Sequence, residues 1–568
     1  MTRPSSTLII FILIITILIP TSSLTLGEEN NNNINQTKQL SIESYDGYTL
    51  FTPEFTTKTL LINNDGETIH SWESENIQGL PVYLLENGHL IRGCSLLRNP
   101  RFIAGGVTGR VEMHDWNNTL IWEFDYSTNN HCLHHDIEVL PNGNILMTAW
   151  EYKTAAEAIS AGRNPNNIQN QQLWPDTIIE VEPTSSTTGN IVWEWHVWDH
   201  LIQDFDSTRE NYGIIADHPE LIDINSGGRQ SDLNHINSVD YNEELDQILL
   251  SSHNQNEIWI IDHSTTTEEA AGHTGGRYGR GGDLLYRWGN PRIYEQGDSA
   301  DQQLFGQHDA QWIKSGCPGE GNILIFNNGQ NRPEGKYTSI VEIEPPLQNN
   351  GSYQYNPESA FLPIEPIWVY TDTPPTNFFA SKVSGAQRLP NGNTLICSGD
   401  EGYFFEVTLE GEKVWDFQNI YPLFGKKNVF KIQRYGLNYS GLGFLSNHPN
   451  KPSTPTGTLT GIIDKEYCYS CYATDPNDDD LYYLFDWGDG TNSDWIGPIK
   501  SGKNINVTHI WASKGDYSIQ VKAKDTHGLE SEWSDPLTIE MPKKYAFTFP
   551  RIFKNHYFFS FIALLLRK

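Results

Sequence analysis

A repeated pattern of short hairpins runs from about residue 50 to residue 420 and limits the folds open to this chain more than any other feature. One element is an Asn-Gly turn between apolar residues, found within 84–91, 139–146 and 388–395. This dipeptide is typical of a two-residue β-hairpin, because both central residues adopt positive φ. The second element is a short strand that contains tryptophan, and it recurs at Trp72, Trp122, Trp193, Trp288, Trp368 and Trp415. Six units of four short strands predict an all-β fold whose residues 45–420 form a six-bladed β-propeller, with the tryptophans packed between blades.

Length and charge exclude several classes of protein. The chain has 568 residues, more than one ordinary hydrophobic core organises, so more than one domain is expected. Its 71 acidic residues exceed its 38 basic residues and give a formal net charge of −33. Because nucleic-acid binding relies on clustered lysine and arginine, this balance predicts no nucleic-acid partner.

The two ends of the chain predict export. Residues 8–19 are apolar apart from Thr16, and small polar residues follow. Twelve helical residues rise about 18 Å, which is short of the roughly 30 Å hydrocarbon core of a bilayer. We therefore predict a signal peptide over 1–23, with an uncleaved anchor as the alternative, followed by a polar linker over 24–44. The tail 542–568 ends in an apolar stretch that is also too short to span. The protein is expected to be secreted or held at the cell surface.

The rhythm of the sequence changes beyond a predicted linker at 421–451. Residues 452–541 contain the turn Asp-Trp-Gly-Asp-Gly at 486–490 and a Gly-Asp-Tyr strand that begins at residue 515. Both motifs resemble a PKD domain, an immunoglobulin-like β-sandwich common on exported proteins. The resemblance implies contact with a cell surface or a carbohydrate.

Two sequence features of this second domain suggest a metal. An acidic loop offers oxygen ligands for a structural calcium ion at Asp475, Asp478 and Asp480, with a solvated turn as the alternative. Cys468 and Cys471 have the spacing of a metal or redox pair. However, no second pair completes a zinc site, and positions i and i+3 of a strand face opposite sides. No other cofactor is expected.

Candidate site residues emerge when the repeats are aligned on their Asn-Gly turns. His135 and Ser384 both lie eight residues before the turn glycine of their unit. Two further units begin the same strand with Asn-His-Ile-Asn-Ser at 234–238 and Gly-Gln-His-Asp-Ala at 306–310. His135, His235 and His308 are therefore predicted to approach the central channel from three blades. Further polar residues flank these strands, namely His134, His253, Asn328, Arg332 and Asp400.

Three imidazoles and a guanidinium suit a tetrahedral oxyanion. Arginine supplies a rigid fork of donors, and histidine can donate, accept or attack. Zinc held by three histidines is the competing chemistry, which His134, His135 and Asp136 keep open.

Together with the six units and the segment 384–395, these motifs resemble the arylsulfotransferase (arylsulfate sulfotransferase) propeller family over residues 45–420. The resemblance implies sulfuryl transfer from an aryl sulfate ester to a phenol, outside the cytoplasm and without a nucleotide sulfate donor. In that family, channel histidines and an arginine hold the sulfuryl group, and a late-blade histidine takes it covalently. His235, His308 and Arg332 match the family pattern. We also assign a catalytic role to His135 and substrate binding to His134, His253, Asn328 and Ser384.

The chain departs from the family at the covalent step. No histidine lies between His308 and His448, and Lys382 and Ser384 occupy the expected neighbourhood. Three outcomes follow: His135 or His253 takes the sulfuryl group, the transfer is direct, or the propeller binds without turnover. The alternative function is therefore a non-catalytic exported propeller that holds an anionic or glycan ligand.

Overall fold

The structure is a computed structural model that describes residues 43–96, 99–356, 359–422, 425–445, 448–526 and 528–542. The predicted signal peptide, nearly all of the polar linker, and the tail from residue 543 lie outside the described residues. Within the described part of the chain, no helix has the length and apolar character needed to cross a bilayer.

Six antiparallel four-stranded sheets make up the described residues between 47 and 436. From one edge to the other, the first sheet contains β28 (Gln433–Gly436), β1 (Gly47–Phe51), β2 (Lys58–Ile62) and β3 (Thr68–Glu73). The second contains β4 (Gln78–Leu84), β5 (Leu90–Ser95), β6 (Gly109–His114) and β7 (Leu120–Asp125). The third contains β8 (His131–Val139), β9 (Ile145–Glu151), β12 (Asp176–Ser185) and β13 (Thr188–His196). The fourth sheet contains β16 (Ile236–Asn242), β17 (Gln247–Ser252), β18 (Glu257–Asp262) and β19 (Tyr286–Trp288). The fifth contains β20 (His308–Trp312), β21 (Ile323–Asn327), β22 (Ser339–Ile343) and β23 (Trp368–Tyr370). The sixth contains β24 (Gly385–Arg388), β25 (Thr394–Ser398), β26 (Tyr403–Val407) and β27 (Lys413–Gln418). The all-β prediction is confirmed.

Short elements lie in the connections. Two small sheets pair β10 (Lys153–Thr154) with β11 (Gln172–Leu173) and β14 (Leu201–Ile202) with β15 (Ile222–Asp223). The α-helices are α1 (Ala155–Ser160) and α2 (Thr267–Ala270), each begun by a threonine capping box. The 3₁₀ turns are η1 (Pro165–Asn167), η2 (Val197–His200), η3 (Ile215–Asp217), η4 (Pro291–Tyr294), η5 (Pro375–Asn377) and η6 (Ser440–Leu442).

The first sheet corrects the predicted linker at 421–451. β28 lies within that range and pairs with β1, so that Gly436 is opposite Gly47 and Gln433 is opposite Leu50. The sequence pattern of β28 gave no sign of this, because a four-residue strand is too short to show an alternation. A segment near residue 434 thus completes the sheet that residue 47 begins.

The sheets are linked at their outer strands by the six recurring tryptophans. Each indole Nε1 donates a hydrogen bond of 2.6–3.2 Å to the next sheet in sequence order, and the sixth donates to the first. The donor and acceptor residues are Trp72 to Asp115, Trp122 to Thr188, Trp193 to Thr265, Trp288 to Pro363, Trp368 to Leu409, and Trp415 to Asn64. The tryptophans therefore lie between sheets.

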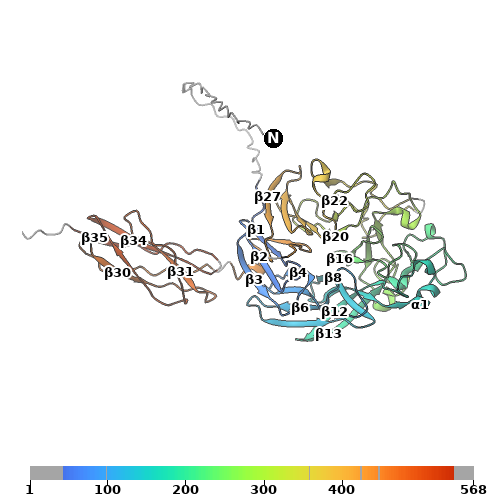
Figure 1. Ribbon diagram of the computed structural model, residues 1–568, viewed down its shortest axis with the longest axis horizontal. Helices are drawn as coiled ribbons and strands as arrows, with labels where there is room; N and C mark the ends of the chain where they lie inside the picture. The colour runs from blue at the N-terminus through green and yellow to red at the C-terminus, as the bar shows by residue number, and fades with distance from the viewer. Residues whose placement is uncertain are drawn as a thin grey trace, which may run out of the picture. The chain divides into compact units, whose positions relative to one another are not determined.

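The inner strands are linked in the same order. Figure 1 shows β4, β8, β16 and β20 in the middle of this part of the chain, with β3 and β13 farther out. Side chains of one inner strand bond to the next through Tyr83–Asp136, Asp136–Val239, Asp240–Trp312, Asp309–Ala386, Gln387–Arg434 and Tyr435–Leu84. Polar contacts thus join the centre, and apolar contacts fill the space between sheets.

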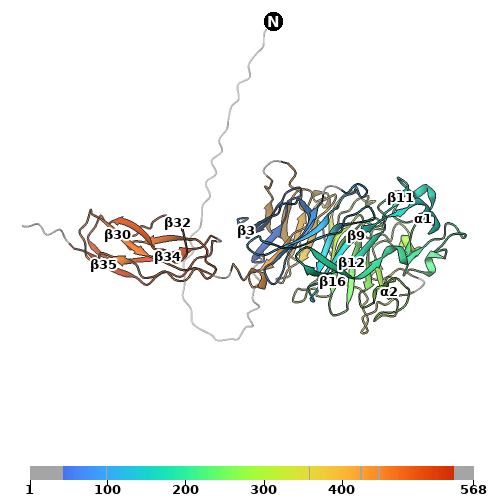
Figure 2. The ribbon, with the colours of Figure 1, turned by 90° about the horizontal axis from the view of Figure 1, so that it is seen from below.

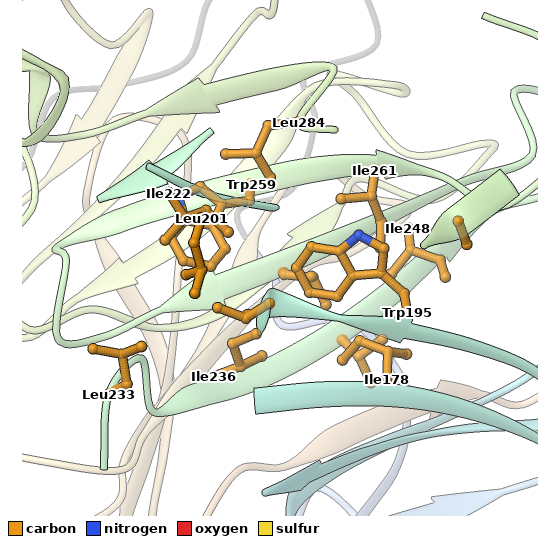
Figure 3. Packing of buried hydrophobic residues seen from close by; sticks show 14 of the residues in the cluster. Ile178, Trp195, Leu201, Ile222, Leu233, Ile236, Ile248, Trp259, Ile261 and Leu284 are labelled. Carbon is orange, nitrogen blue, oxygen red and sulfur yellow. The ribbon is translucent and has the colours of Figure 1, made fainter. Parts of the chain in front are cut away.

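The largest apolar cluster packs the third sheet on the fourth. Figure 3 shows Trp195 of β13 and Ile178 of β12 against Ile248 and Ile261, with Trp259 nearby. All residues of β17 and β18 are buried, because both faces of the fourth sheet are covered. Large aromatic side chains supply much of the buried apolar area that holds such sheets together.

Residues 456–541 form a separate β-sandwich (Figure 2). One sheet contains β29 (Thr456–Gly457), β30 (Glu466–Cys471) and β33 (Ile505–Ile510). The other contains β32 (Ile496–Ile499), β31 (Leu481–Asp486), β34 (Gly515–Lys524) and β35 (Leu537–Met541). Trp487 and Trp511 lie in its core. Cys468 is exposed and Cys471 is buried, as expected for positions three apart on a strand, and all six cysteines are free thiols.

Candidate active site

Two histidines on the inner strands of the third and fourth sheets have a strained backbone conformation, His135 within β8 and His235 directly before β16. His135 has φ 51° and His235 has φ 56°, in the left-handed region that non-glycine residues rarely adopt. A register shift between Leu133 and Ile137 marks a β-bulge at the first of them. Such bulges re-aim side chains and commonly lie beside functional sites. In the fifth sheet the left-handed residue is Asp309, φ 50°, so that His308 lies one position earlier.

Four imidazoles from three sheets meet as a continuous row. The ring centroids are 4.4 Å apart for His135 and His235, 5.2 Å for His235 and His253, and 5.3 Å for His253 and His308. His253 comes from the turn after β17, and its backbone N–H donates to the His235 carbonyl. The structure thus brings together these four of the residues predicted from the sequence. We call them the imidazole row.

His134 extends the row to a buried carboxylate. Its Nδ1 lies 2.9 Å from Nδ1 of His135, and its Nε2 lies 3.0 Å from Oδ1 of Asp176. Asp176 begins β12 and also accepts the backbone N–H groups of His235 and Ile236. Burial raises the pKa of the Asp176 carboxyl, while the hydrogen bond to His134 acts in the opposite direction.

Asp232 raises the pKa of His235, in contrast to the other members of the row. Nδ1 of His235 lies 2.5 Å from Asp232 Oδ2, while Trp150 Nε1 donates to the other carboxylate oxygen over 3.0 Å. Burial lowers the pKa of His235, but the Asp232 charge and hydrogen bond outweigh it, so the pKa is raised. Trp150 also stacks on His134, with centroids 4.0 Å apart. The same tryptophan therefore supports both carboxylate–histidine pairs.

The other three imidazoles are held neutral. Burial, followed by the nearby His235, lowers the pKa of His135 well below its usual range. Burial and the same neighbour lower the pKa of His253 to about 4. Burial and the His253 ring likewise lower the pKa of His308. The row therefore combines one imidazole whose pKa is raised with three whose pKa is lowered.

Amide side chains orient His308 and His253. Nδ1 of His308 lies 2.8 Å from Asn328 Oδ1, and the amide nitrogen of Asn328 donates to the carbonyls of Ala380 and Val383. These donations fix the amide so that its oxygen faces the ring, and His308 Nδ1 is the donor. Asn254 does the same for His253, over 3.1 Å. Asn328 thus contacts the row directly.

Arg332 has other partners. Its Nη2 donates to Ser339 Oγ over 2.8 Å, and its guanidinium lies over the rings of Tyr337 and Phe305 at 4.3 and 5.0 Å. Burial lowers its pKa. Within the described part of the chain, no hydrogen bond joins Arg332 to the imidazole row.

Ser384 occupies the expected strand position but is engaged by backbone. Its hydroxyl donates to Lys382 O over 3.1 Å and accepts from Gly399 N over 2.9 Å, and the residue has φ 85°. Lys382, by contrast, lines an open cavity of about 320 Å³. The same cavity is lined by Asp400, Glu401, Lys426, Lys427 and Asn428. Ser384 therefore supports the turn, and Lys382 adds positive charge beside it.

A buried lysine that the sequence did not reveal lies next to the row. Lys431 Nζ is 2.9 Å from Asp136 and 3.1 Å from Asp309, the residues that directly follow His135 and His308. The charges of these two aspartates outweigh burial and raise the pKa of Lys431. Only the adjacency of Asp136 and Asp309 to histidines could have pointed to such a group, because Lys431 lies in the predicted linker.

The zinc site predicted at the histidines and the calcium site predicted at the acidic loop can be compared with the clusters of metal-ligating side chains. Among the described residues, two groups of three metal-ligating side chains have ligand atoms within 4.8 Å of one another, His200 with His273 and Asp283, and Asp475 with Asp479 and Asp525. The imidazole row is not one of these two groups. Near Asp475, the structure gathers Asp479 and Asp525 in place of the expected Asp478 and Asp480. Asp480 instead pairs with Lys500 over 2.8 Å. The structural calcium ion stays a prediction.

Comparison with known proteins follows the same division of the chain. The family model "Arylsulfotransferase (ASST)" matches residues 33–433, and a PKD domain model matches residues 465–535. A collagenase, ColA of Bacillus cereus, is 29% identical over 85 residues, which are 15% of this chain and 8% of that protein.

Two solved structures are similar to smaller parts of the chain. A PKD domain of an M14-like peptidase from Thermoplasmatales archaeon SCGC AB-540-F20 is 43% identical, covering 17% of this chain and 99% of that one, with a TM-score of 0.16. A structure of carbohydrate-binding modules of the β-sandwich superfamily is 18% identical, covering 16% of this chain and 35% of that one, with a TM-score of 0.13.

Proposed function

Because the chain belongs to the arylsulfotransferase family and carries a PKD domain, we propose that it transfers a sulfuryl group from an aryl sulfate ester to a phenolic acceptor, without a nucleotide sulfate donor. The observation that carries this proposal is the imidazole row, in which His235, with a raised pKa, and three histidines with lowered pKa values lie within ring contact of one another. Sulfuryl transfer uses both kinds of group: a cationic donor stabilises negative charge on the sulfuryl oxygens, and a neutral imidazole acts as the nucleophile that attacks sulfur.

The proposal includes a six-bladed β-propeller as the scaffold. Two sets of hydrogen bonds support it, one through the six tryptophans and one through the six inner strands, and each set returns from the sixth sheet to the first. The pairing of β28 with β1 adds a closing strand of the kind that leaves no long open edge. Such a ring would direct the starts of β8, β16 and β20 toward one channel mouth.

His235 is the cation in this mechanism. Its pKa is raised by Asp232, and 18% of its side chain is exposed, so the ring can face a ligand. With Nδ1 donating to Asp232, its protonated Nε2 is free to donate to an oxygen of the sulfuryl group or to the leaving phenoxide. A donor fixed before the reaction lowers the barrier more than one that must reorient.

His135 is the nucleophile in this mechanism. His134 Nε2 lies 3.0 Å from the Asp176 carboxylate, and the mechanism assigns the ring proton to that nitrogen, which leaves Nδ1 as an acceptor. His135 Nδ1 therefore donates to His134, and the lone pair of His135 resides on Nε2. His253 and His308 rest on neutral amides, which cannot take up a proton. Of the three imidazoles with a lowered pKa, His135 is the one linked to a carboxylate, through His134 to Asp176, so it can pass on the positive charge that attack creates.

The first half-reaction balances as follows. His135 Nε2 forms a bond to sulfur, the bond from sulfur to the aryl oxygen breaks, and the aryl oxide leaves with its electron pair. The ring becomes an N-sulfo imidazolium whose Nδ1 proton is shared with His134, while the His134 Nε2 proton is drawn toward Asp176. In the second half, the phenol gives its proton to His235 Nε2, which protonated the departing aryl oxide in the first half. The phenol oxygen attacks sulfur, and the bond from sulfur to His135 Nε2 breaks and returns its electron pair to that nitrogen.

We further propose that the reaction takes place outside the cell. The predicted signal peptide and the PKD domain support export, since the resemblance of this second domain is to modules of exported proteins. Substrates are then small aryl sulfates and phenols that reach the surface. The PKD domain is proposed to contact a cell-surface component or a carbohydrate.

The test is turnover by the purified full chain of 4-nitrophenyl sulfate with phenol as acceptor. We expect release of 4-nitrophenol, and intact-mass analysis without acceptor should show one added sulfuryl group on His135. His135→Ala should lose at least about a thousandfold in kcat, as for removal of a nucleophile, whereas the exposed His218→Gln should match the native chain.

Each result is decisive for a different part of the proposal. If no aryl sulfate is turned over but the ester binds saturably, the sulfotransferase proposal is rejected in favour of the alternative, a non-catalytic binding protein. Turnover that survives in His135→Ala, or a sulfuryl label on His253, would keep the function and reject the nucleophile.

A further inference from the structure

A second set of histidines lies apart from the residues of the imidazole row. His200 ends η2, after β13, whereas His273 and Asp283 begin and end the glycine-rich segment that joins α2 to β19. One ligand atom from each of these residues lies within 4.8 Å of the others. His200 is fully buried and Asp283 is nearly so, while 60% of the His273 side chain is exposed. The group is therefore anchored in the protein and open on one side.

The orientation of His200 is fixed by the backbone. Its Nε2 lies 2.8 Å from the carbonyl oxygen of Ala270, which can only accept, so Nε2 carries the hydrogen. The ring also stacks on Trp195, with planes within 8° of parallel. Nδ1 of the neutral ring then presents a lone pair to Asp283 Oδ1, 2.9 Å away. Two acceptors at this distance require a positive charge between or beside them.

His273 contacts the same oxygen atom. Its Nδ1 is 2.8 Å from Asp283 Oδ1, and its ring is nearly perpendicular to that of His200. The neutral Nδ1–H tautomer of His273 can donate to this oxygen, whereas His200 needs a second proton on its ring to do so. A single divalent cation is a partner for all three side chains at once.

The loop that carries His273 and Asp283 is shaped around His200. Gly282 N donates to Gly272 O over 3.0 Å, which closes the segment at its base, and Trp195 Nε1 donates to Gly282 O over 2.7 Å. A Cβ atom on Gly282 would lie 2.6 Å from His200 Nε2, so only glycine permits this approach. The protein fold thus sets the positions of His200 and Asp283, and the exposed His273 ring can adjust.

We propose that His200, His273 and Asp283 bind one divalent transition-metal ion of the zinc type, with a water molecule as the fourth ligand. Two imidazoles and one carboxylate are donors that zinc accepts, and a three-residue set with an open position is a common zinc arrangement. A ring nitrogen that donates to a backbone carbonyl is also the usual support of a metal-bound histidine. Binding would tie the segment 272–282 to the corner after β13, whether or not the chain transfers sulfuryl groups.

The experiment is a zinc titration of the full chain, purified without a histidine tag and treated with a chelator. We expect one equivalent to bind, with a rise in melting temperature, and His273→Ala to weaken binding by at least about tenfold. Because His273 is exposed, that variant should fold. His235→Ala, which alters the imidazole row, and the exposed His218→Gln serve as controls and should bind as the native chain does.

Cobalt gives an independent readout. Co²⁺ in place of zinc should show the intense visible bands of a four-coordinate site, and these should disappear in Asp283→Asn while circular dichroism stays that of the native chain. Zinc binding that is unchanged in His273→Ala, or lost only in His235→Ala, would overturn the proposal. Absence of any binding near neutral pH would assign the positive charge to protons.

Discussion

The inner strands of the third and fourth sheets and that of the sixth share a backbone geometry and differ in chemistry. His135, His235 and Ser384 all have positive φ, the first at a bulge within its strand and the other two directly before theirs. The two histidines contact each other through their rings, whereas the Ser384 hydroxyl is bonded to backbone on both sides. The strained strand start is therefore a property of the scaffold. The side chain placed on it decides whether a sheet contributes chemistry or only holds a turn.

Lys431 connects these two regions. It precedes β28 in the chain and lies between Asp136 of the third sheet and Asp309 of the fifth. Asp309 in turn accepts the backbone N–H of Ala386 in the sixth sheet. The histidine-bearing strands are thus fixed to the closing segment by charge. Removing the contacts of Lys431 is therefore the most severe test of the difference between the histidine-bearing strands and the sixth sheet.

The largest effect is expected from Lys431→Met. Removing one partner of a buried ion pair costs about 3–5 kcal/mol, because the remaining charge is left without compensation. Here two carboxylates are left, so we expect the upper part of that range in the free energy of unfolding, measured by chemical denaturation. Exposed Lys58→Met is the matched control.

The pH dependence of this variant gives a sharper test. Burial raises the pKa of Asp309, and Lys431 opposes that rise in the native chain. Without the lysine, the folded-state pKa should rise further above the unfolded value. The stability deficit should then be small in acid, where the carboxyls are protonated, and grow as the pH rises through the unfolded pKa toward neutrality. A deficit independent of pH would show that lost packing, not charge, is responsible.

The sequence could predict the strand starts but not their partners. The Asn-Gly turns repeat, so counting back from them located His135 and indicated its relation to His235 and His308. The same count selected Ser384, since an alignment of positions cannot tell a side chain that faces a ligand from one that bonds to backbone. Asp176, Asp232 and Lys431 belong to no repeat. Their contacts depend on how the sheets close, which no local pattern records.

The next largest effect is expected from Asp232→Asn. The asparagine keeps a hydrogen bond to His235 but removes the charge that raises its pKa. We expect kcat for aryl sulfate turnover to fall by about a hundred- to a thousandfold, as for loss of a fixed transition-state donor. The exposed Asp217→Asn should be unaffected.

The pH profile distinguishes this role from a structural one. The proposed mechanism needs His235 protonated, so activity should fall as the pH rises through its raised pKa. It also needs neutral His135, whose pKa is lowered, so the acid limb should lie well below neutrality. In Asp232→Asn the alkaline limb should move to lower pH. If kcat falls with both limbs unmoved, Asp232 merely positions the ring.

A smaller effect, of another kind, is expected from Ser384→Ala. The change leaves the buried Gly399 N–H without its acceptor, which costs about 1–3 kcal/mol of stability. Turnover per folded molecule should stay close to that of the native chain, because the Ser384 hydroxyl contacts no member of the imidazole row among the described residues. A loss of kcat without a loss of stability would return Ser384 to the substrate site.

The smallest effect is expected from Trp415→Phe, which tests whether the sixth sheet closes on the first. The change removes the hydrogen bond from Nε1 to the Asn64 carbonyl and should cost about 0.5–1.5 kcal/mol, plus the lost stacking on Arg434. Trp122→Phe removes the equivalent bond between the second and third sheets and is the matched comparison. In a closed ring, hydrogen exchange in Trp415→Phe should accelerate in β2 and β3 as well as in β26 and β27. Acceleration confined to β26 and β27 would mean that the first and sixth sheets are not coupled, and the six-bladed propeller would have to be abandoned.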